Sequence, residues 1–296
     1  MISVIICTYN RASFLPKALS SLCDTSCRDY EVIFVDNNST DDTALTVKSI
    51  ADGNPHIRYV FEPNQGLSNA RNRGIEEAKG DIFLFLDDDA FVEKDYLSAL
   101  EGYIADYPEA GVYGGRILPY FDGCNKPKWL SRWSMGWLSA LDLGVKVKPF
   151  AKGKYPFGGN NAIKRSVIEQ CGGFNPSLGR NGATMSGGEE KDLFNRVRKA
   201  GIDIIYCPKM LLHHIIRETR TTMAFVDKYA QGIGEGERVR SISNGSYPQR
   251  LIQEAVKWCA TLVLLLWYCV TLRPSCGTAL VRFRAGVTRS LLRKAE

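Results

Sequence analysis

Short apolar runs alternate with amphipathic stretches along the first two hundred residues. The apolar runs are rich in Val, Ile and Phe and predict buried strands. These runs lie at 3–7, 30–36, 57–61 and 82–86. The stretches between them repeat apolar residues with a period near 3.6 and predict helices at 14–22, 41–50 and 67–78. Because strands and helices alternate, the pattern predicts an α/β fold with a mostly parallel, doubly wound sheet and right-handed crossovers.

The pattern is less regular in the middle of the chain. Strands are predicted at 111–117 and 202–206, a helix at 193–199 and turns at 157–161. Trp129, Trp133 and Trp137 recur every four residues, so we expect them on one face of a helix. Aromatic rings suit both a packed core and a sugar or lipid acceptor, so Trp129 is also a candidate acceptor contact.

The chain changes character after residue 235. The nearly continuous apolar run 258–272 would span about 22 Å as a helix, which is less than the ~30 Å hydrocarbon core of a bilayer. Extending the run through 251–257 adds Glu254 and Lys257. We therefore predict two domains, 1–235 and a helical, membrane-associated extension at 236–296.

The formal net charge of +6 is concentrated at the end of the chain, where residues 273–296 carry five Arg and one Lys against one Glu, a net +5. A basic tail beside an apolar segment favours an anionic membrane surface over nucleic acid. A helix beyond Pro274 would place apolar and basic residues on opposite faces. Its apolar face would hold Leu280, Phe283, Val287 and Leu291, and the opposite face Arg282, Arg289 and Arg293, with Arg284 breaking the pattern. Such a helix suits a lipid surface; in the alternative, both C-terminal helices pack on the preceding domain.

Nine cysteines are scattered without metal-finger spacing, and the N-terminus does not resemble a signal peptide. Reduced thiols in the cytosol are expected from this pattern. Together with the basic tail, it predicts peripheral or monotopic attachment to the cytoplasmic face of the cell membrane.

The acidic triplet Asp87, Asp88 and Asp89 directly follows the predicted strand at 82–86. Ligands of open α/β sheets bind at the carboxyl ends of the strands. Three neighbouring carboxylates repel one another there, and a divalent cation would offset the repulsion. The alternative is a solvated acidic loop that caps the next helix.

Polar residues also follow the first two strands. Thr8, Tyr9 and Arg11 lie in the first turn, without the G-x-G-x-x-G pattern of dinucleotide sites. Asp36 ends the second strand and is suited to accept hydrogen bonds from a base N–H or a ribose hydroxyl. Capping of the next helix is its alternative role, although Ser39 or Asp41 would serve equally well.

Taken together with the acidic triplet, these residues make the sequence resemble the family 2 glycosyltransferases of the GT-A fold. The resemblance covers about residues 2–235. Further matching segments are 62–72 before the acidic strand, 158–162, the acidic segment 188–193, and His213. The family usually has Asp as the second acid of the segment 188–193, where this chain has Glu190.

The resemblance implies a role for each matching residue. Nucleotide binding is implied for Thr8, Tyr9, Arg11, Asp36, Asn64, Arg71, Asp87 and Asp88. Asp89 and His213, rather than His214, would bind Mn²⁺ or Mg²⁺. Gly159, Asn160 and Asn161 would face the acceptor. Glu190 would be the general base, with Glu189 and Asp192 as alternates.

The predicted activity is an inverting, metal-dependent transfer of a sugar from a nucleotide donor, with UDP- or dTDP-sugars favoured. The acceptor would be a glycan or a lipid-linked sugar in cell-surface polysaccharide synthesis. A metal beside the diphosphate would stabilise the leaving charge, and a carboxylate would take the proton of the acceptor hydroxyl. Two alternatives remain at this stage: a nucleotidyltransferase, and an inactive sugar-nucleotide-binding scaffold at the membrane.

Overall fold

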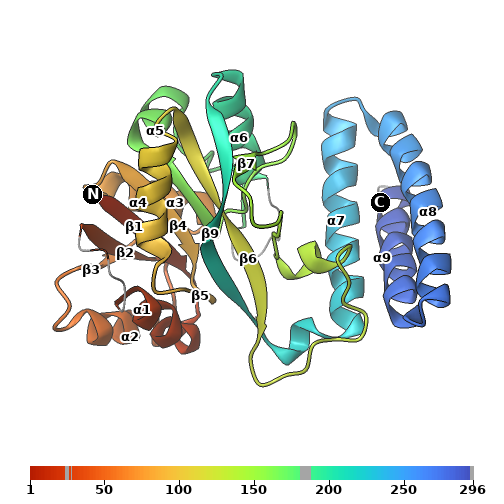
Figure 1. The fold of residues 1–296 in the computed structure, drawn as a ribbon, viewed down its shortest axis with the longest axis horizontal. Coiled ribbons are helices and arrows are strands. Elements are labelled where there is room, and N and C mark those ends of the chain that lie inside the picture. Colours follow the sequence, from red (N-terminus) through yellow and green to blue (C-terminus); the bar gives the residue numbers. More distant parts are fainter. Residues whose placement is uncertain (24–26, 28, 181–187, 294–296) are drawn as a thin grey trace. The chain divides into compact units, whose positions relative to one another are not determined.

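The computed structural model describes residues 1–23, 27, 29–180 and 188–293, and Figure 1 shows the course of the chain. The chain forms two compact units. The first unit comprises Met1–Leu118 and Leu141–Ile215, and the second comprises Pro119–Ala140 and Ile216–Glu296. The predicted domain boundary at 235/236 falls inside the helix α7 (Met223–Ser243) of the second unit.

The predicted alternation of strands and helices builds one half of the sheet in the first unit. Four parallel strands lie in the order β3-β2-β1-β4. They are β1 (Ile2–Thr8), β2 (Tyr30–Asp36), β3 (Ile57–Phe61) and β4 (Ile82–Asp87). The predicted helices are confirmed as α1 (Leu15–Cys23), α2 (Thr43–Ala51) and α3 (Leu67–Glu77). In this half, local periodicity was sufficient to identify these strands and α-helices.

The other half of the sheet is antiparallel where its pairing is defined, so the doubly wound parallel sheet becomes a mixed one. β4 pairs antiparallel with β8 (Asn160–Lys164), which pairs antiparallel with β6 (Ala110–Phe121). β9 (Asp203–Ile216) pairs antiparallel with the short strands β5 (Ala90–Val92) and β7 (Lys148–Pro149). The remaining helices of this unit are α4 (Tyr96–Asp106), α5 (Arg165–Cys171) and α6 (Glu189–Lys199). Strand direction here depends on which distant segments pair, and local periodicity does not encode it.

Both faces of the sheet are covered. Alternate residues of β1 enter different hydrophobic clusters: Val4 and Ile6 pack with Leu19 of α1, whereas Ile5 packs in a second cluster with Ala70 of α3. Successive strand side chains point to opposite faces, so each strand needs apolar residues at nearly every position. This explains the continuous apolar runs seen in the sequence.

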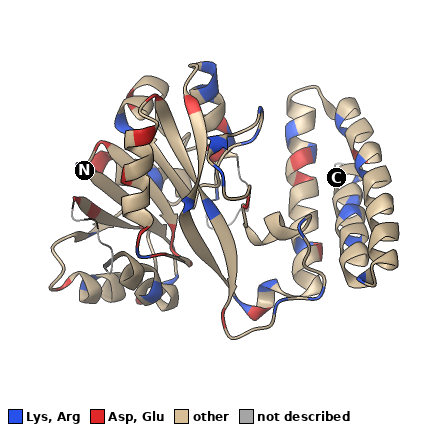
Figure 2. Cartoon of the chain, viewed as in Figure 1, with Lys and Arg blue, Asp and Glu red and all other residues tan. Residues whose placement is uncertain are grey.

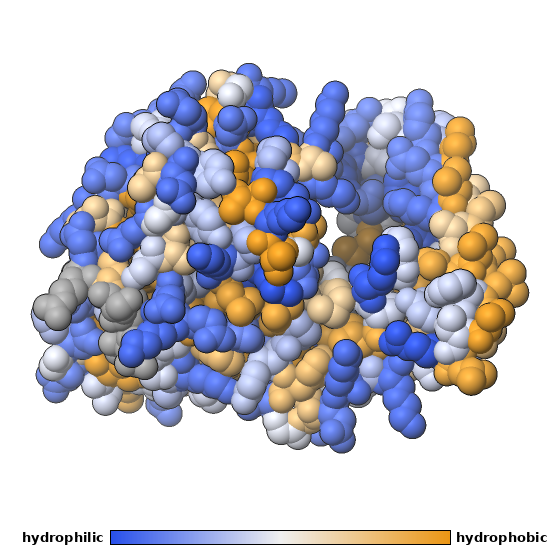
Figure 3. Space-filling model, viewed as in Figure 1, coloured by the Kyte–Doolittle hydropathy of each residue, from blue (hydrophilic) through white to orange (hydrophobic). Residues whose placement is uncertain are grey.

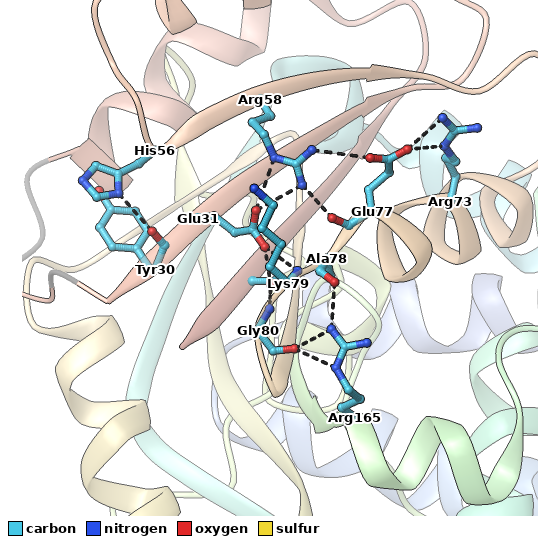
Figure 4. A network of polar contacts seen from close by, with 11 residues as sticks. Tyr30, Glu31, His56, Arg58, Arg73, Glu77, Ala78, Lys79, Gly80 and Arg165 are labelled. Carbon is cyan, nitrogen blue, oxygen red and sulfur yellow. Dashed lines mark hydrogen bonds and ion pairs between the residues drawn. The ribbon is translucent and has the colours of Figure 1, made fainter.

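A polar network ties the first unit together around β2, β3 and α3 (Figure 4). The carboxylate of Glu31 accepts hydrogen bonds from the Ser3 hydroxyl at 2.8 Å and from Arg58 Nη2 at 3.1 Å. Arg58 also reaches the Glu77 carboxylate, and Arg165 donates to the Gly80 carbonyl at 2.8 Å. Although burial would raise the pKa of Glu31, hydrogen bonds from the Lys79 amide, the Ser3 hydroxyl and Arg58 lower it. Glu31 is therefore a charged structural anchor.

In the second unit, three helices follow one another: α7, α8 (Tyr247–Val270) and α9 (Pro274–Leu292). α9 packs against both α7 and α8 (Figure 1). Its apolar residues Leu280, Val287 and Leu291 are buried in this packing. The apolar face that the sequence assigned to a lipid surface is therefore an internal face of the second unit.

The predicted tryptophan helix does not form. The segment 127–138 consists of turns and one short 3₁₀ helix, Met135–Leu138. Trp129 and Trp137 are buried, with ring centroids 5.7 Å apart, while Trp133 is exposed. Trp129 Nε1 donates to the Thr221 carbonyl at 2.7 Å. Trp129 is thus a core residue of the second unit, and its buried ring is not accessible to an acceptor.

The interior of the second unit is polar around Glu254. The Glu254 carboxylate accepts from Arg250 Nη2 at 2.9 Å, Arg284 Nη1 at 3.1 Å and the Thr288 hydroxyl at 3.0 Å. Trp258 Nε1 in turn donates to the Thr288 hydroxyl at 2.9 Å. Burial would raise the pKa of Glu254, but the two arginines and Thr288 lower it. The carboxylate therefore holds charge inside the bundle.

Glu254→Ala is expected to lower the free energy of unfolding by about 3–5 kcal/mol, because it leaves two inward-facing guanidinium groups without their shared partner. Glu235→Ala is the matched control, since Glu235 is exposed on α7 and accepts one hydrogen bond from Gln231. We expect its effect to stay within about 0.5 kcal/mol. Urea unfolding followed by circular dichroism measures both, and equal midpoints for the two variants would contradict the role given to Glu254.

Candidate active site

The strands β1, β2 and β4 end side by side, with Thr8 opposite Asp36 and Cys7 opposite Asp87 in the sheet register. Parallel strands bring their carboxyl ends to one edge, so residues far apart in sequence meet there. The acidic triplet leaves β4 at this edge. The predicted meeting of the first turn, Asp36 and the triplet is confirmed.

Each of the last two acids of the triplet has a specific partner. The Thr8 hydroxyl donates to Asp88 at 2.7 Å, and Arg11 Nη1 donates to Asp89 at 2.6 Å. His214 Nε2 lies 3.2 Å from Asp89 Oδ1. Burial, partly offset by Arg11, raises the pKa of Asp88 to about 7. Burial alone would also raise the pKa of Asp89, but His214 and Arg11 hold it well below its usual range.

The structure brings His214, not His213, to the acidic triplet. The predicted strand at 202–206 continues to Ile216, so both histidines lie within β9, opposite Ala90 and Phe91 of β5. Neighbouring residues of a strand point to opposite faces. His213 Nε2 lies 2.6 Å from Glu93 Oε1, and its ring stacks on Phe91 at 4.9 Å. The structure therefore places His214, rather than the predicted His213, beside Asp89.

Asp36 is buried and held by two protein donors. The Tyr59 hydroxyl donates to Asp36 Oδ2 at 2.9 Å, and the Ser39 amide donates to Oδ1 at 2.9 Å. Burial and Asp36 raise the pKa of Tyr59 to about 12, so its hydroxyl remains a donor. Tyr59 was missed in the sequence, where it appeared only as one residue of a strand. Asp36 is thereby fixed in orientation at the strand end.

The first turn is pinned to the loop after β2. Asn10 has a left-handed backbone (φ 53°), and its Oδ1 accepts from the Thr40 amide at 2.7 Å. Tyr9, just before it, exposes its ring. Asn64 is also exposed, and its carbonyl accepts from Asn37 Nδ2 at 2.8 Å. Tyr9 and Asn64 thus follow β1 and β3 as accessible groups near the strand ends.

Arg71 joins the acidic segment to α3. It is buried, and its guanidinium lies 3.2 Å from Glu189 Oε1 and 3.2 Å from Glu190 Oε1. It also lies over the Phe174 ring, 5.0 Å from the centroid. One arginine therefore holds two carboxylates that are adjacent in sequence. The two acids begin α6, where the helix dipole favours negative charge.

Of the three acids considered as the general base, Glu190 has the raised pKa that suits this role. Burial raises its pKa above the usual value, Glu189 and Asp87 raise it further, and Arg71 opposes them. Asp192 is different: its side chain is 36% exposed and pairs with Arg196 at 2.8 Å within α6. Asp192 thus serves the helix, whereas Glu189 and Glu190 face Arg71.

The two glycines before β8 bring these groups together. A Cβ on Gly158 would collide with the Glu190 carboxylate, and one on Gly159 would collide with the Asp87 carboxylate. The Asp87 amide also faces the Gly159 carbonyl at 3.4 Å. The backbone at 158–159 therefore lies against both Glu190 and the acidic triplet. Any side chain there would displace a carboxylate.

The two asparagines that follow are buried and mostly structural. Asn160 accepts from the Tyr96 hydroxyl at 2.5 Å and donates to the Arg116 carbonyl at 2.9 Å. Asn161 donates to the Phe157 and Gly158 carbonyls at 3.1 Å, and its buried Oδ1 has no donor among the described residues. These contacts shape the 157–161 turn. Of the side-chain atoms of these two asparagines, Asn161 Oδ1 is the one left without a partner among the described residues.

A sequence model described as glycosyl transferase family 2 matches residues 3–172, more than half of the chain. The chain belongs to this family. It is therefore a glycosyltransferase, and the family resemblance inferred from the motifs is confirmed. The match covers β1 to β4, the acidic triplet and the 158–161 turn.

Several characterised proteins are similar to this glycosyltransferase. The glucosyl-dolichyl phosphate glucuronosyltransferase of Haloferax volcanii is 24% identical over 251 residues, 84% of this chain and 79% of that protein. The GalNAc(5)-diNAcBac-PP-undecaprenol beta-1,3-glucosyltransferase of Campylobacter jejuni is 31% identical over 191 residues, 62% of this chain and 58% of that protein. The mannosyltransferase PcManGT of Pyrobaculum calidifontis, solved with GDP-Man and Mn²⁺, aligns with a TM-score of 0.63 at 21% identity, covering 98% of this chain and 87% of that one. This last likeness confirms the GT-A fold.

The donor set at the acidic triplet fits a divalent cation that shares its coordination with a ligand. Carboxylate oxygens suit hard cations, and His214 adds a nitrogen beside Asp89. Among the described residues, no three His, Cys, Asp or Glu side chains form a ready metal cage. Oxygens of a bound diphosphate and water would therefore complete the coordination. Mg²⁺ and similar ions are commonly held by one or two carboxylates plus substrate phosphates.

The first unit also has a cavity of about 610 Å³, lined in part by Ile2, Ile82 and Lys164. Ile2 and Ile82 are the first residues of their strands, so this cavity lies at the amino ends of β1 and β4. The acidic triplet lies beyond the carboxyl end of β4. The cavity is therefore separate from the site described above.

Proposed function

We propose that this glycosyltransferase transfers a sugar from a nucleotide-sugar donor to a hydroxyl of a glycan or lipid-linked acceptor, with inversion at the anomeric carbon. The observation that carries the proposal is the half-buried Glu190, with a raised pKa, beside the backbone that also touches Asp87. A base and a leaving-group site beside the same short glycine backbone suit a single displacement. Similar proteins named for dolichyl phosphate and undecaprenol substrates support a lipid-linked acceptor.

The donor would lie along the strand ends. The exposed ring of Tyr9 offers a stacking surface for the base, and Asp36 offers a fixed acceptor to the nucleoside. We expect UDP- or dTDP-sugars as donors. The diphosphate would lie beside Asp89, where Arg11 supplies positive charge. Mn²⁺ or Mg²⁺ held by Asp89 and His214 would supply further stabilisation of the leaving diphosphate.

Glu190 would take the proton of the acceptor hydroxyl as that oxygen attacks the anomeric carbon. The carbon–oxygen bond to the diphosphate breaks in the same step, and its electron pair leaves with the nucleoside diphosphate. One displacement inverts the anomeric centre. Arg71 would keep Glu190 oriented through its 3.2 Å contact.

The test is a screen of nucleotide sugars with Mn²⁺, read by release of nucleoside diphosphate and by NMR of the product anomer. Release of a nucleoside diphosphate and an inverted product would support the proposal. Retention of configuration would contradict inversion, and turnover of GDP-mannose alone would contradict the expected UDP or dTDP donor. Pyrophosphate release would identify a nucleotidyltransferase, and binding without turnover would identify a scaffold.

The pH dependence provides a separate prediction. Because the pKa of Glu190 is raised, the base is lost on acidification at a pH above that expected for an ordinary Glu. Glu189→Gln removes a negative charge that raises this pKa and leaves Arg71 to act on Glu190 alone. We therefore expect the acid limb of kcat/KM to move to lower pH in Glu189→Gln. Asp192→Asn is the control, because Asp192 pairs with Arg196, and its acid limb should not move. An unchanged limb in Glu189→Gln would show that Glu190 is not the titrating group.

A further inference from the structure

The helix α8 has the reverse of the polarity that a soluble helix shows. Its buried residues are Arg250, Glu254, Thr261 and Tyr268, most of them polar or charged. Its exposed residues are mainly apolar. They include Ile252, Val256, Leu262, Val263, Leu266, Trp267 and Val270. A helix in contact with water normally keeps its charged residues outside and its apolar residues inside.

The exposed apolar residues form a continuous surface. Hydrophobic side chains gather over α8 in Figure 3, whereas blue side chains cover much of the rest of the visible face. The residues 258–272 contain no charged side chain. Contiguous apolar surfaces of this kind on a soluble protein mark an interaction site. We name this surface, formed by the exposed apolar residues of α8, the α8 face.

The buried partners of α8 show that its orientation is set by the fold. Glu254 is held by Arg284 and Thr288 of α9, and Arg250 Nε donates to Glu237 of α7 at 3.0 Å. Turning α8 to hide its apolar side would break these contacts and expose or strand several charges. These buried contacts therefore keep the α8 face exposed on the second unit.

Charge next to the α8 face matches an anionic surface. Lys257 and Arg273 bracket the uncharged apolar run, and both are exposed. The described segment 273–293 carries five Arg and no Asp or Glu, and basic residues recur along α9 in Figure 2. Arg282 and Arg284 pair with Asp227 and Glu254 of the neighbouring helices, whereas Arg273, Arg289 and Arg293 are exposed. Trp267 lies within the run and is exposed, and tryptophan suits the boundary between lipid tails and headgroups. Apolar burial and attraction to anionic lipid together give firmer attachment than either alone.

The helices packed with α8 favour an orientation along the membrane surface. Among the described residues, α8 is the one helix long and apolar enough to cross a bilayer. However, α9 packs along it and carries the exposed residues Arg282 and Arg289. Carrying each arginine to the bilayer centre costs about 2.5–3.5 kcal/mol on insertion scales. A helix lying in the interface avoids that cost and keeps the basic residues at the headgroups.

We propose that the α8 face binds the surface of an anionic lipid bilayer, with α8 lying in the plane of the interface and its outer residues among the acyl chains. The cytoplasmic face of the cell membrane, which carries negative surface potential, is the location that fits this chemistry. The attachment is monotopic. It does not depend on the donor, the metal or the base proposed for the first unit.

The experiment is flotation of the full chain with vesicles of phosphatidylcholine and phosphatidylglycerol. The variant Val263→Lys/Leu266→Lys places two charges on the α8 face. Leu45→Lys/Val145→Lys is its matched control, because the same residue types are exposed to a similar degree in the first unit, 69% for Leu45 and 68% for Leu266. We expect the unaltered chain and the control to float. The α8 variant should partition at least about 10-fold less, as the loss of two buried aliphatic side chains implies.

Lipid composition and salt separate the two contributions. Vesicles of phosphatidylcholine alone should bind the unaltered chain more weakly, and 1 M salt should release it only in part, since apolar burial persists when charges are screened. Brominated acyl chains should quench the fluorescence of Trp267, and the quenching should fall in Trp267→Phe, provided that circular dichroism shows both proteins folded. This measurement keeps the proposal testable if the double lysine variant fails to fold.

Three results would overturn the proposal. The first is an unaltered chain that stays in the aqueous fraction with anionic vesicles. The second is equal flotation of the folded α8 variant and its control. The third is a dimer, seen by light scattering, that Val263→Lys/Leu266→Lys dissociates while no vesicle binds, which would assign the α8 face to a second copy of the chain.

Discussion

Asp89→Ala is expected to abolish transfer that depends on a divalent cation while leaving the fold intact. Asp89 is the acid of the triplet whose pKa lies well below its usual range, so it remains a carboxylate at neutral pH. Its contacts with Arg11 and His214 place it where a metal and a diphosphate would meet. Removing it would take away a hard oxygen ligand for that cation. The measurement is nucleoside diphosphate release over a Mn²⁺ titration, with circular dichroism to confirm folding.

The two histidines sharpen this test. His214→Ala should raise the Mn²⁺ concentration needed for half-maximal activity, because His214 lies 3.2 Å from Asp89. His213→Ala should change it little, since His213 faces Glu93. Full activity in Asp89→Ala would remove the metal assignment. A Mn²⁺ requirement that shifts in His213→Ala and not in His214→Ala would show that His213 is the metal-side histidine.

Glu190→Gln is expected to lower kcat by about 10²-fold or more, with donor binding retained, as loss of a general base does. The amide keeps the shape of the side chain but cannot accept the acceptor proton. Donor affinity, measured by calorimetry with Mn²⁺, should change little because the candidates Thr8, Asp36 and Asp87 lie at the strand ends of β1, β2 and β4. The separation of kcat from donor binding distinguishes a base from a group that only supports the fold.

Asp192→Asn is the matched control for Glu190→Gln. It makes the same change from acid to amide two residues later in α6, at a side chain that is 36% exposed and paired with Arg196. We expect near-normal kcat from it. An active Glu190→Gln together with an inactive Asp192→Asn would show that the base has been assigned to the wrong carboxylate.

Much of the site was accessible from the sequence because its signals are local. The apolar runs identify β1 to β4, and a strand that ends in acids at the edge of a parallel sheet is a ligand site whatever its neighbours are. The acidic triplet, Thr8, Arg11 and Asp36 meet as the pattern predicted. The order and spacing of the motifs also identified the family, because both can be read directly from the sequence.

Other features depended on contacts between distant segments. The face of β9 that meets the triplet follows from its pairing with β5, so only the folded chain distinguishes His214 from His213. Arg71 had no sequence signal for its pairing with Glu189 and Glu190, which lie more than a hundred residues away. The first depends on strand register and the second on packing, and local periodicity determines neither.

The C-terminal helices show the same division. The sequence by itself determined that an apolar helix and a basic amphipathic helix follow the first unit. Only the tertiary structure decided which of them presents apolar residues outward, because a helix face is buried or exposed according to its neighbours. α9 packs its apolar face inside the second unit, and α8 turns Glu254 and Arg250 inward to Arg284 and Glu237. Amphipathic patterning predicts that a face will be covered, and the packing of the whole chain decides what covers it.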